Sequence, residues 1–326
     1  MTESDALVIP GWTDRTACPI CASPDIQMFC ANIQVHRPTT RWSICNVCNH
    51  VFVNPHPDSK WLNDWYHNGY RKMTHRLEEE NSEKIPVGSG NEELGRAVHI
   101  MNTLHRWMGA GKITSHLDIG SSTGSLLAAL MDRFKVERSV GVEPNDAWRT
   151  FSLNSFKKFM DTAQKSVLSD HPRAFSVYEN IKQVPKTPKF DLVTCIHTLE
   201  HTLEPMDIIS GASARMKPNA VLMIMVPYLF GGFVDPLMFP HLHVWTRETI
   251  TRVLELSGME VELFETGTTS APFWMPPGDF TVIAKKAGAV KPMNKTRLLE
   301  VYQNASEVAR NAREAQRKAP VTYTMG

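Results

Sequence analysis

Hydrophobic and polar positions follow two different periods along the middle of the chain. Short apolar runs alternate with longer segments whose apolar residues recur every three or four positions. The short runs predict buried strands, at His116–Ile119, Ser139–Val142, Phe175–Tyr178, Leu192–Ile196 and Val221–Val226. The longer segments predict helices between them, notably at Gly124–Phe134 and Met206–Met216. Strands that alternate with helices in this way form a parallel sheet covered on both faces, which indicates the α/β class.

The same pattern continues on either side of this core. A helix is predicted from about Glu92 to Met108, and a later one at Arg247–Ser257. Two further strands are predicted at Glu260–Glu265 and Phe280–Lys285, which brings the expected sheet to seven strands. A chain of 326 residues has room for one such domain, here residues 92–290, and for a small additional unit.

Three segments lie outside the predicted α/β domain. Residues 1–60 are rich in Cys and Pro and predict a small domain of short strands and turns. Residues 61–91 are expected to begin with an aromatic helix and to end in a polar linker. Residues 291–326 predict a charged helical tail, because their apolar residues recur at helical spacing. We expect this C-terminal helix to pack either on its own domain or against a second copy, as in a homodimer.

Composition excludes several classes of partner. The chain carries 35 Lys and Arg against 34 Asp and Glu, a net charge of +1, whereas general nucleic-acid binders usually show a basic excess. No apolar run is long enough to span a bilayer, and the first residues lack the charged and apolar regions of a secretory signal. We therefore expect no nucleic-acid partner, no membrane segment and a cytoplasmic location, in which thiols stay reduced.

Four of the six cysteines form two C-x-x-C pairs, namely Cys18, Cys21, Cys45 and Cys48. The spacing within a pair lets two thiolates reach one ion, and two pairs complete a tetrahedral shell. Four thiolates leave no position for water, which is typical of a structural zinc ribbon rather than a catalytic zinc site. The alternative is a set of buried or redox-active cysteines. The remaining Cys30 and Cys195 are expected to pack in the core.

The first predicted strand leads into a turn that contains Gly120 and Gly124. These glycines allow tight turning and close approach of the backbone to a ligand. Their spacing differs from the G-x-G-x-x-G of dinucleotide enzymes, and the turn lacks the G-K-[ST] of a P-loop. Glu143, at the end of the next strand, can accept hydrogen bonds from both hydroxyls of a ribose. Since ligands of such sheets bind outside the carboxyl ends of the strands, these residues predict a nucleotide-type site.

Three motifs resemble those of class I S-adenosylmethionine-dependent methyltransferases. The first two are D-I-G-x-x-x-G, which begins at Asp118, and G-V-E-P, which contains Glu143. The third, FDLVTCIHTLEH over residues 190–201, resembles the F-D-x-V…L-E-H signature of small-molecule methyltransferases. The cysteine ribbon followed by the aromatic helix resembles bacterial methyltransferases with an N-terminal zinc-binding domain, including sugar methyltransferases. The resemblance implies a Rossmann-like seven-stranded sheet, S-adenosyl-L-methionine as the cofactor and a structural Zn²⁺.

The resemblance also assigns roles within the turn. It implies that Asp118 and Gly120 line the methionine part of the cofactor and that Glu143 holds the ribose. Gly124 would let the following helix approach closely, while Ser122 stands where the family usually has a second glycine.

Further segments are expected to enclose the site. Tyr66 and Tyr70 fall where related enzymes place a lid over the cofactor, with ordinary helix packing as the alternative. Residues 227–239 and 268–277 are apolar loops rich in Gly and Pro, and we expect them to form the acceptor pocket.

A group of acid–base residues follows the fourth strand of the core. If a helical turn begins at His197, then His197, Glu200 and His201 share one face. Together with His241 they resemble the divalent-metal site of small-RNA 2′-O-methyltransferases, with His197 in place of a glutamate. Three roles remain open for this cluster: a structural brace, a catalytic base at His201 or His241, or a second metal site.

The leading functional hypothesis is methyl transfer from S-adenosylmethionine to an oxygen or carbon of a small-molecule acceptor, such as a sugar or secondary metabolite. One alternative is an RNA methyltransferase guided by the zinc ribbon, which the balanced charge disfavours. The other is a non-catalytic, cofactor-binding scaffold, which the acid–base residues beside the predicted cofactor site disfavour.

Overall fold

The computed structural model describes residues 11–33, 40–66, 89–108, 112–165, 174–227, 237, 239–266 and 279–287. A seven-stranded sheet forms its centre, in the order β12-β13-β10-β9-β6-β7-β8. The strands from β6 to β10 pair in parallel, whereas β13 is antiparallel to both of its neighbours. The strands are β6 (Ser115–Ile119), β7 (Arg138–Val142), β8 (Ala174–Tyr178), β9 (Phe190–Ile196), β10 (Met216–Pro227), β12 (Met259–Thr266) and β13 (Asp279–Lys286). All seven predicted strands are present, and the α/β, Rossmann-like fold is confirmed.

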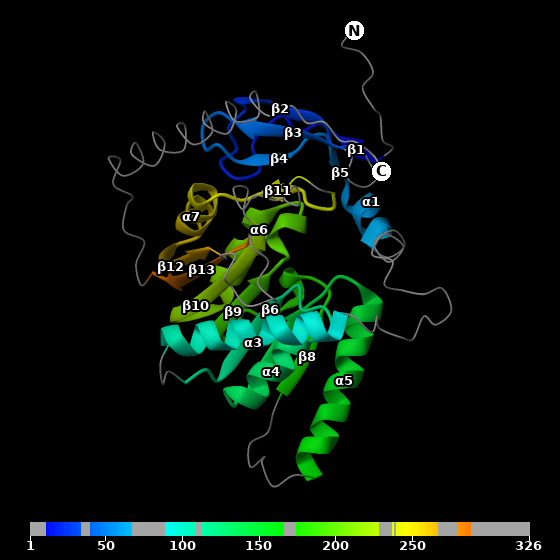
Figure 1. Cartoon of the computed structure of the whole chain (residues 1–326), viewed down its shortest axis with the longest axis vertical. Coiled ribbons are helices and arrows are strands. Elements are labelled where there is room, and N and C mark those ends of the chain that lie inside the picture. Colours follow the sequence, from blue (N-terminus) through cyan, green and yellow to red (C-terminus); the bar gives the residue numbers. More distant parts are fainter. Residues whose placement is uncertain are drawn as a thin grey trace, which may run out of the picture.

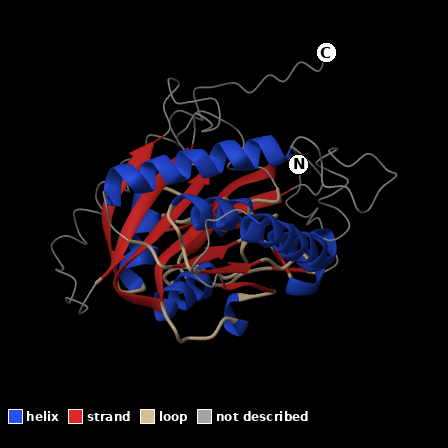
Figure 2. Cartoon of the chain, turned by 90° about the horizontal axis from the view of Figure 1, so that it is seen from below, coloured by secondary structure: helices blue, strands red, loops and turns tan. Residues whose placement is uncertain are grey.

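Helices cover both faces of this sheet (Figure 1, Figure 2). They are α3 (Ser89–Met108), α4 (Ser125–Arg133), α5 (Asp146–Lys165), α6 (Pro205–Arg215) and α7 (Arg247–Leu256), with two short 3₁₀ turns, η2 (Ile181–Gln183) and η3 (Leu199–His201). The four helices predicted individually are confirmed, although α3 begins at Ser89 rather than at Glu92. The long α5 follows β7, in a stretch where the sequence pattern singled out no helix.

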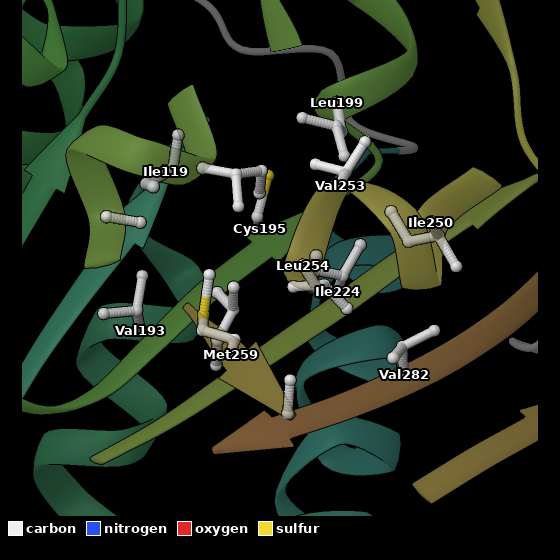
Figure 3. Close-up of a cluster of buried hydrophobic side chains, with 14 of the residues drawn as sticks. Ile119, Val193, Cys195, Leu199, Ile224, Ile250, Val253, Leu254, Met259 and Val282 are labelled. Carbon is white, nitrogen blue, oxygen red and sulfur yellow. The ribbon is translucent and has the colours of Figure 1, made fainter. Parts of the chain in front are cut away.

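Side chains of successive strand residues enter two different cores, because a strand alternates its faces. Leu192, Met223 and Met225 pack with α3 and α4 on one face. Val193 and Ile224 pack with α6 and α7 on the other. Figure 3 shows part of this second core, where Val193, Cys195 and Ile224 lie near residues of α7 and of β13. Both faces are therefore buried, as the apolar strands predict.

The N-terminal part forms a small antiparallel sheet in the order β11-β4-β3-β2, beside the pair β1-β5 and the short helix α1. Its strands are β1 (Trp12–Thr13), β2 (Ile26–Ile33), β3 (Thr40–Cys45), β4 (Val51–Val53), β5 (His56–Pro57) and β11 (His243–Val244); α1 spans Ser59–Asp64. The strand β11 comes from the segment between β10 and α7, so the large domain supplies one edge of the small sheet. Figure 1 shows the small sheet above α7, and Phe52 shares a core with Trp245 and Ile250.

Several predicted features fall outside the described residues. These are Tyr70, residues 81–88 of the predicted linker, most of the two predicted acceptor loops (228–236 and 268–277) and the whole C-terminal tail at 291–326. Within the part that is described, every helix is too short or too polar to cross a lipid bilayer.

Candidate active site

The turn after β6 depends on two glycines with left-handed backbone. Gly120 has a φ of 78° and its N–H donates to the carbonyl of Val142 at 2.8 Å, while Gly124 has a φ of 79° and caps the start of α4. A Cβ atom at Gly120 would collide with the hydroxyl of Thr198, and one at Gly124 with the hydroxyl of Ser152. Both predicted glycines are thus required by the turn itself and by the close approach of neighbouring side chains.

Glu143, directly after β7, presents a buried carboxylate to this turn; the residue is 8% exposed. Its Oε2 accepts a hydrogen bond from the N–H of Ser122 at 2.9 Å, and its Oε1 accepts one from the N–H of Asn145 at 2.9 Å. Ser122 has a φ of 47°, the left-handed conformation that the family's usual glycine would adopt there. A direct hydrogen bond therefore joins the predicted turn to Glu143, the residue that is predicted to bind the ribose.

Asp118 lies at the end of β6, in register with Thr194 of β9. The Thr194 hydroxyl donates to Asp118 Oδ1 at 2.6 Å and lies 2.7 Å from His116 Nε2. Because the hydroxyl gives its own proton to Asp118, it accepts from His116, whose proton is therefore on Nε2. Burial lowers the pKa of His116 to about 3, so the ring stays neutral. This chain of three groups fixes the Asp118 carboxylate from inside the sheet.

His197 follows β9 with a φ of 47°, and the helical turn begins two residues later, at Leu199. The condition of a helical turn beginning at His197 is therefore not met, because His197 has left-handed backbone. The ring still reaches Glu200, since Nδ1 lies 3.5 Å from Glu200 Oε1, while Nε2 lies 3.1 Å from Asp279 Oδ2. His197 thus lies between two carboxylates, one from η3 and one from the first residue of β13.

The rings of His201 and His241 also lie near Glu200. Nε2 of His201 is 3.7 Å from Glu200 Oε1, and Nδ1 is 3.2 Å from the carbonyl of Pro240. The centroid of the His241 ring is 4.9 Å from that of His201. Tyr66, one of the two predicted lid residues, lies edge-on to His201 at a centroid distance of 6.3 Å. The structure therefore brings the four predicted acid–base residues together and places Tyr66 against them.

The electrostatics of this cluster favour an ionised Glu200 and a protonated His197. Burial by itself would raise the pKa of Glu200, but His201, His197 and His241 lower it to about 2. Burial likewise opposes the charge of His197, yet Asp279 and Glu200 raise its pKa to about 9. At neutral pH the His197 ring is therefore protonated and lies beside the ionised Glu200.

Sequence reasoning missed Asp279, Thr194 and His116. Each is a buried polar residue on a strand of the central sheet, and its polarity within a largely buried strand is the local signal that could have marked it. Their partners lie on other strands, so only the register of the sheet reveals the pairings.

The four predicted cysteines meet in one cluster, with Cys18 and Cys48 sulfurs 3.5 Å apart and those of Cys21 and Cys45 3.6 Å apart. Ala22 and Asn49, which directly follow the two C-x-x-C pairs, both have a φ of 57°. The N–H of Ala22 donates to the carbonyl of Cys18 and that of Asn49 to the carbonyl of Cys45, at 3.0 and 2.9 Å. Two equivalent knuckles thus face each other, and all four thiols are free of disulfides.

The two leftover cysteines take no part in this cluster. Cys195 is fully buried, and burial raises the pKa of its thiol well above the usual value, which excludes a thiolate nucleophile. Burial also raises the pKa of the half-buried Cys30 to about 11.

Residues 62–263 match a family described as a methyltransferase domain. No curated protein matches the sequence. Among solved structures, the magnesium protoporphyrin IX methyltransferase of Synechocystis PCC 6803 with bound S-adenosylhomocysteine is 14% identical, with a TM-score of 0.48 over 71% of this chain and 100% of that one. An amino pentose methyltransferase from Micromonospora echinaspora is 15% identical, with a TM-score of 0.44 over 65% of this chain and 100% of that one.

The sheet order, the glycine turn and the carboxylate after β7 define a class I, S-adenosylmethionine-dependent methyltransferase. The matched family spans more than half of the sequence, so the chain belongs to this methyltransferase family. Its activity falls in EC 2.1.1.-.

Proposed function

We propose that this methyltransferase acts on a small-molecule acceptor, a sugar or a secondary metabolite, which is held at Glu200, His201 and His241. The observation that carries this proposal is the position of the cluster. Two of its members, Glu200 and His201, lie on η3, which follows β9 after a short loop, and Thr198 of that loop packs against Gly120 of the cofactor turn. An acceptor at the cluster would therefore lie beside the expected position of the sulfonium.

The residues of the turn suit the cofactor. A buried carboxylate held by two backbone N–H groups, as in Glu143, is a rigid acceptor for the paired hydroxyls of a ribose. Asp118 and Gly120 would line the methionine part, with Ser122 and Gly124 shaping the turn around it. S-adenosylmethionine supplies the activated methyl group when bound, and the protein supplies alignment for its in-line displacement. Tyr66 would cover the cluster from the side of α1, since it lies against His201.

A small acceptor fits this chain better than RNA. The net charge of +1 provides no excess of cations for a phosphate backbone. The cluster is itself buried, with Glu200 1% and His241 9% exposed, which favours a compact ligand over a polymer strand.

Incubation of the protein with methyl-labelled cofactor and either a metabolite extract or total RNA distinguishes the two kinds of acceptor, because the label should enter only the small-molecule fraction. Label in the RNA would contradict the proposal.

The cofactor assignment is tested at Glu143. Glu143→Gln keeps the shape of the side chain but removes its charge, and we expect affinity for S-adenosylhomocysteine to fall about 10- to 100-fold in calorimetry. Glu137→Gln, which changes an exposed glutamate paired with Lys112, is the matched control and should bind like the wild type. Equal affinity of the Glu143 variant would refute the ribose role.

We further propose that the four-cysteine cluster binds one structural Zn²⁺. Its sulfur spacings of 3.5 and 3.6 Å suit a tetrahedral shell with zinc–sulfur bonds of about 2.3 Å. Backbone N–H groups of Ile20 and Val47 point to Cys18 and Cys45 sulfurs at 3.4 Å, which would stabilise thiolates. The ion would hold the knuckles together and take no part in the chemistry.

A further inference from the structure

Glu200 is a buried carboxylate whose hydrogen-bonding capacity is unused. It is 1% exposed, and within the described part of the chain neither of its oxygens accepts a hydrogen bond. His197 lies between Glu200 and Asp279, with Nδ1 3.5 Å from Glu200 Oε1 and Nε2 3.1 Å from Asp279 Oδ2, and it makes no hydrogen bond that would satisfy Glu200. A buried carboxylate in this state is costly unless a further positive charge reaches it.

The orientation of His201 indicates where that charge belongs. The carbonyl of Pro240 can only accept, so the ring nitrogen 3.2 Å from it, Nδ1, carries a proton. In the neutral ring Nε2 then carries a lone pair. This atom lies 3.7 Å from Glu200 Oε1, which is too far for a hydrogen bond. Metal-binding histidines have this arrangement, with one nitrogen donating to a backbone carbonyl and the other directed at the ion.

His241 completes a set of three donors. One ligand atom from each of Glu200, His201 and His241 lies within 4.8 Å of the others. The backbone fixes the spacing, because the N–H of Leu242 donates to the carbonyl of Glu200 at 2.7 Å. Two imidazoles and one carboxylate suit Zn²⁺, Fe²⁺, Mn²⁺ or Co²⁺ better than Mg²⁺ or Ca²⁺, and three protein ligands leave positions open for another molecule.

We propose that Glu200, His201 and His241 bind one divalent transition-metal ion, whose open positions hold the hydroxyl of the acceptor. The second half of this proposal rests on the proposed function; the metal site does not. Binding to the ion makes the acceptor hydroxyl more acidic, and its proton passes to water. An oxygen lone pair then forms the bond to the methyl carbon while the carbon–sulfur bond breaks. Its electron pair stays on sulfur, giving neutral S-adenosylhomocysteine and the methyl ether.

The metal site is tested without cofactor or acceptor. Full-length protein carrying one equivalent of Zn²⁺ in the cysteine cluster is titrated with Co²⁺ by calorimetry and absorption spectroscopy. We expect the wild type to bind one further equivalent without a sulfur-to-cobalt charge-transfer band, because this site has no thiolate ligand. His201→Ala should weaken that binding by at least about tenfold, as should the milder His241→Asn if the first variant folds poorly. His105→Ala, which changes an exposed histidine of α3, should leave it unchanged.

Two results would overturn the metal site. One is that the wild type binds no further equivalent of Co²⁺. The other is uptake of Co²⁺ accompanied only by the sulfur-to-cobalt band, which marks displacement of zinc from the cysteine cluster.

The acceptor role is tested separately. Removing the second ion with a mild chelator, while one zinc per chain remains, should lower methyl transfer to the small-molecule fraction and leave affinity for S-adenosylhomocysteine unchanged. Undiminished transfer would overturn the acceptor role alone, and metal binding without any transfer would count against the proposed function instead.

Discussion

Three buried carboxylates at the site are stabilised in three different ways. Glu143 accepts two backbone N–H groups, and Asp118 accepts a threonine hydroxyl. Glu200 is balanced only by histidine rings at 3.5 Å and beyond. Backbone donors fix a carboxylate in one orientation, which suits a residue that positions a ligand. A carboxylate without hydrogen bonds suits a residue that becomes satisfied only when something binds.

Gly120 is the position where a single methyl group should be least tolerated. Gly120→Ala places a methyl group at a φ of 78° and against Thr198. We therefore expect the free energy of unfolding, measured in denaturant, to fall by about 1–3 kcal/mol. The double variant Gly120→Ala with Thr198→Gly should recover part of this loss relative to Thr198→Gly alone. If Gly120→Ala lowers the free energy of unfolding equally with and without the Thr198 side chain, the loss comes from the backbone conformation and not from the collision.

Among the elements, β9 joins the two halves of the sheet through Asp191 near its start. Oδ2 of Asp191 accepts the hydroxyl of Thr114 at 2.6 Å and that of Ser115 at 2.9 Å, while Oδ1 accepts Lys217 Nζ at 2.7 Å. These partners lie before or on β6 and on β10, the two neighbours of β9. The aspartate of the F-D-x-V motif therefore holds three strands together at the end of the sheet away from the cofactor turn.

Asp191→Asn should accordingly lower stability in a pH-dependent way. Burial would raise the pKa of Asp191, but Lys217, Thr114 and Ser115 lower it from 3.8 to about 2, which after screening by solvent corresponds to roughly 1–2 kcal/mol of stability. Because the pKa is lower in the folded state, this contribution is complete above the unfolded pKa near 4 and disappears as the pH falls through about 2. Urea unfolding of wild type and variant should differ at pH 7 and converge in acid.

Glu262→Gln, at an exposed ion pair with Lys285, serves as the control and should change stability by well under 1 kcal/mol. A difference between Asp191→Asn and the wild type that stays constant from pH 7 to pH 2 would assign the loss to packing.

At the scale of the whole molecule, the small N-terminal sheet supports the acceptor side of the site. The N–H of Val53 in β4 donates to the carbonyl of Leu242, whose own N–H donates to the carbonyl of Glu200. Two backbone hydrogen bonds therefore connect the small sheet to the cluster.

Buried histidines make a second connection. His243 Nε2 donates to the carbonyl of Thr202 at 2.8 Å, so its Nδ1 accepts from His50 Nε2 at 3.0 Å. His50 in turn is bound through its carbonyl to the N–H of Cys45, at 2.9 Å. The knuckle of one cysteine pair is thus connected to the loop after η3, and a change in the knuckle should reach the acceptor cluster first.

Cys21→Ser should therefore lose one zinc per chain and lower methyl transfer more than cofactor affinity. The measurements are metal content by mass spectrometry, transfer of labelled methyl groups and calorimetry with S-adenosylhomocysteine. Cys30→Ser, which changes a half-buried cysteine outside the cluster, should leave all three unaltered. Wild-type zinc content in Cys21→Ser would contradict the metal role, and equal losses of transfer and affinity would contradict the connection.

Much of the architecture follows from local patterns. Apolar runs separated by amphipathic segments predict the seven strands, because burial on both faces requires near-continuous hydrophobic residues. The C-x-x-C pairs predict the sulfur cluster, since two residues of spacing already bring both thiols to one side of a knuckle. Gly120, Gly124 and Glu143 are likewise recognisable from their distance to the ends of predicted strands.

What only the tertiary structure decides is which distant groups become partners. The pairing of Asp118 with Thr194 depends on the register of β6 and β9, and that of His197 with Asp279 on the position of β13. The addition of β11 to the edge of the small sheet, which places His241 beside Glu200, depends on pairing with β4, a strand far away in the sequence. Periodicity records which face of an element is buried, but not which neighbour covers it, because many partners bury the same face equally well.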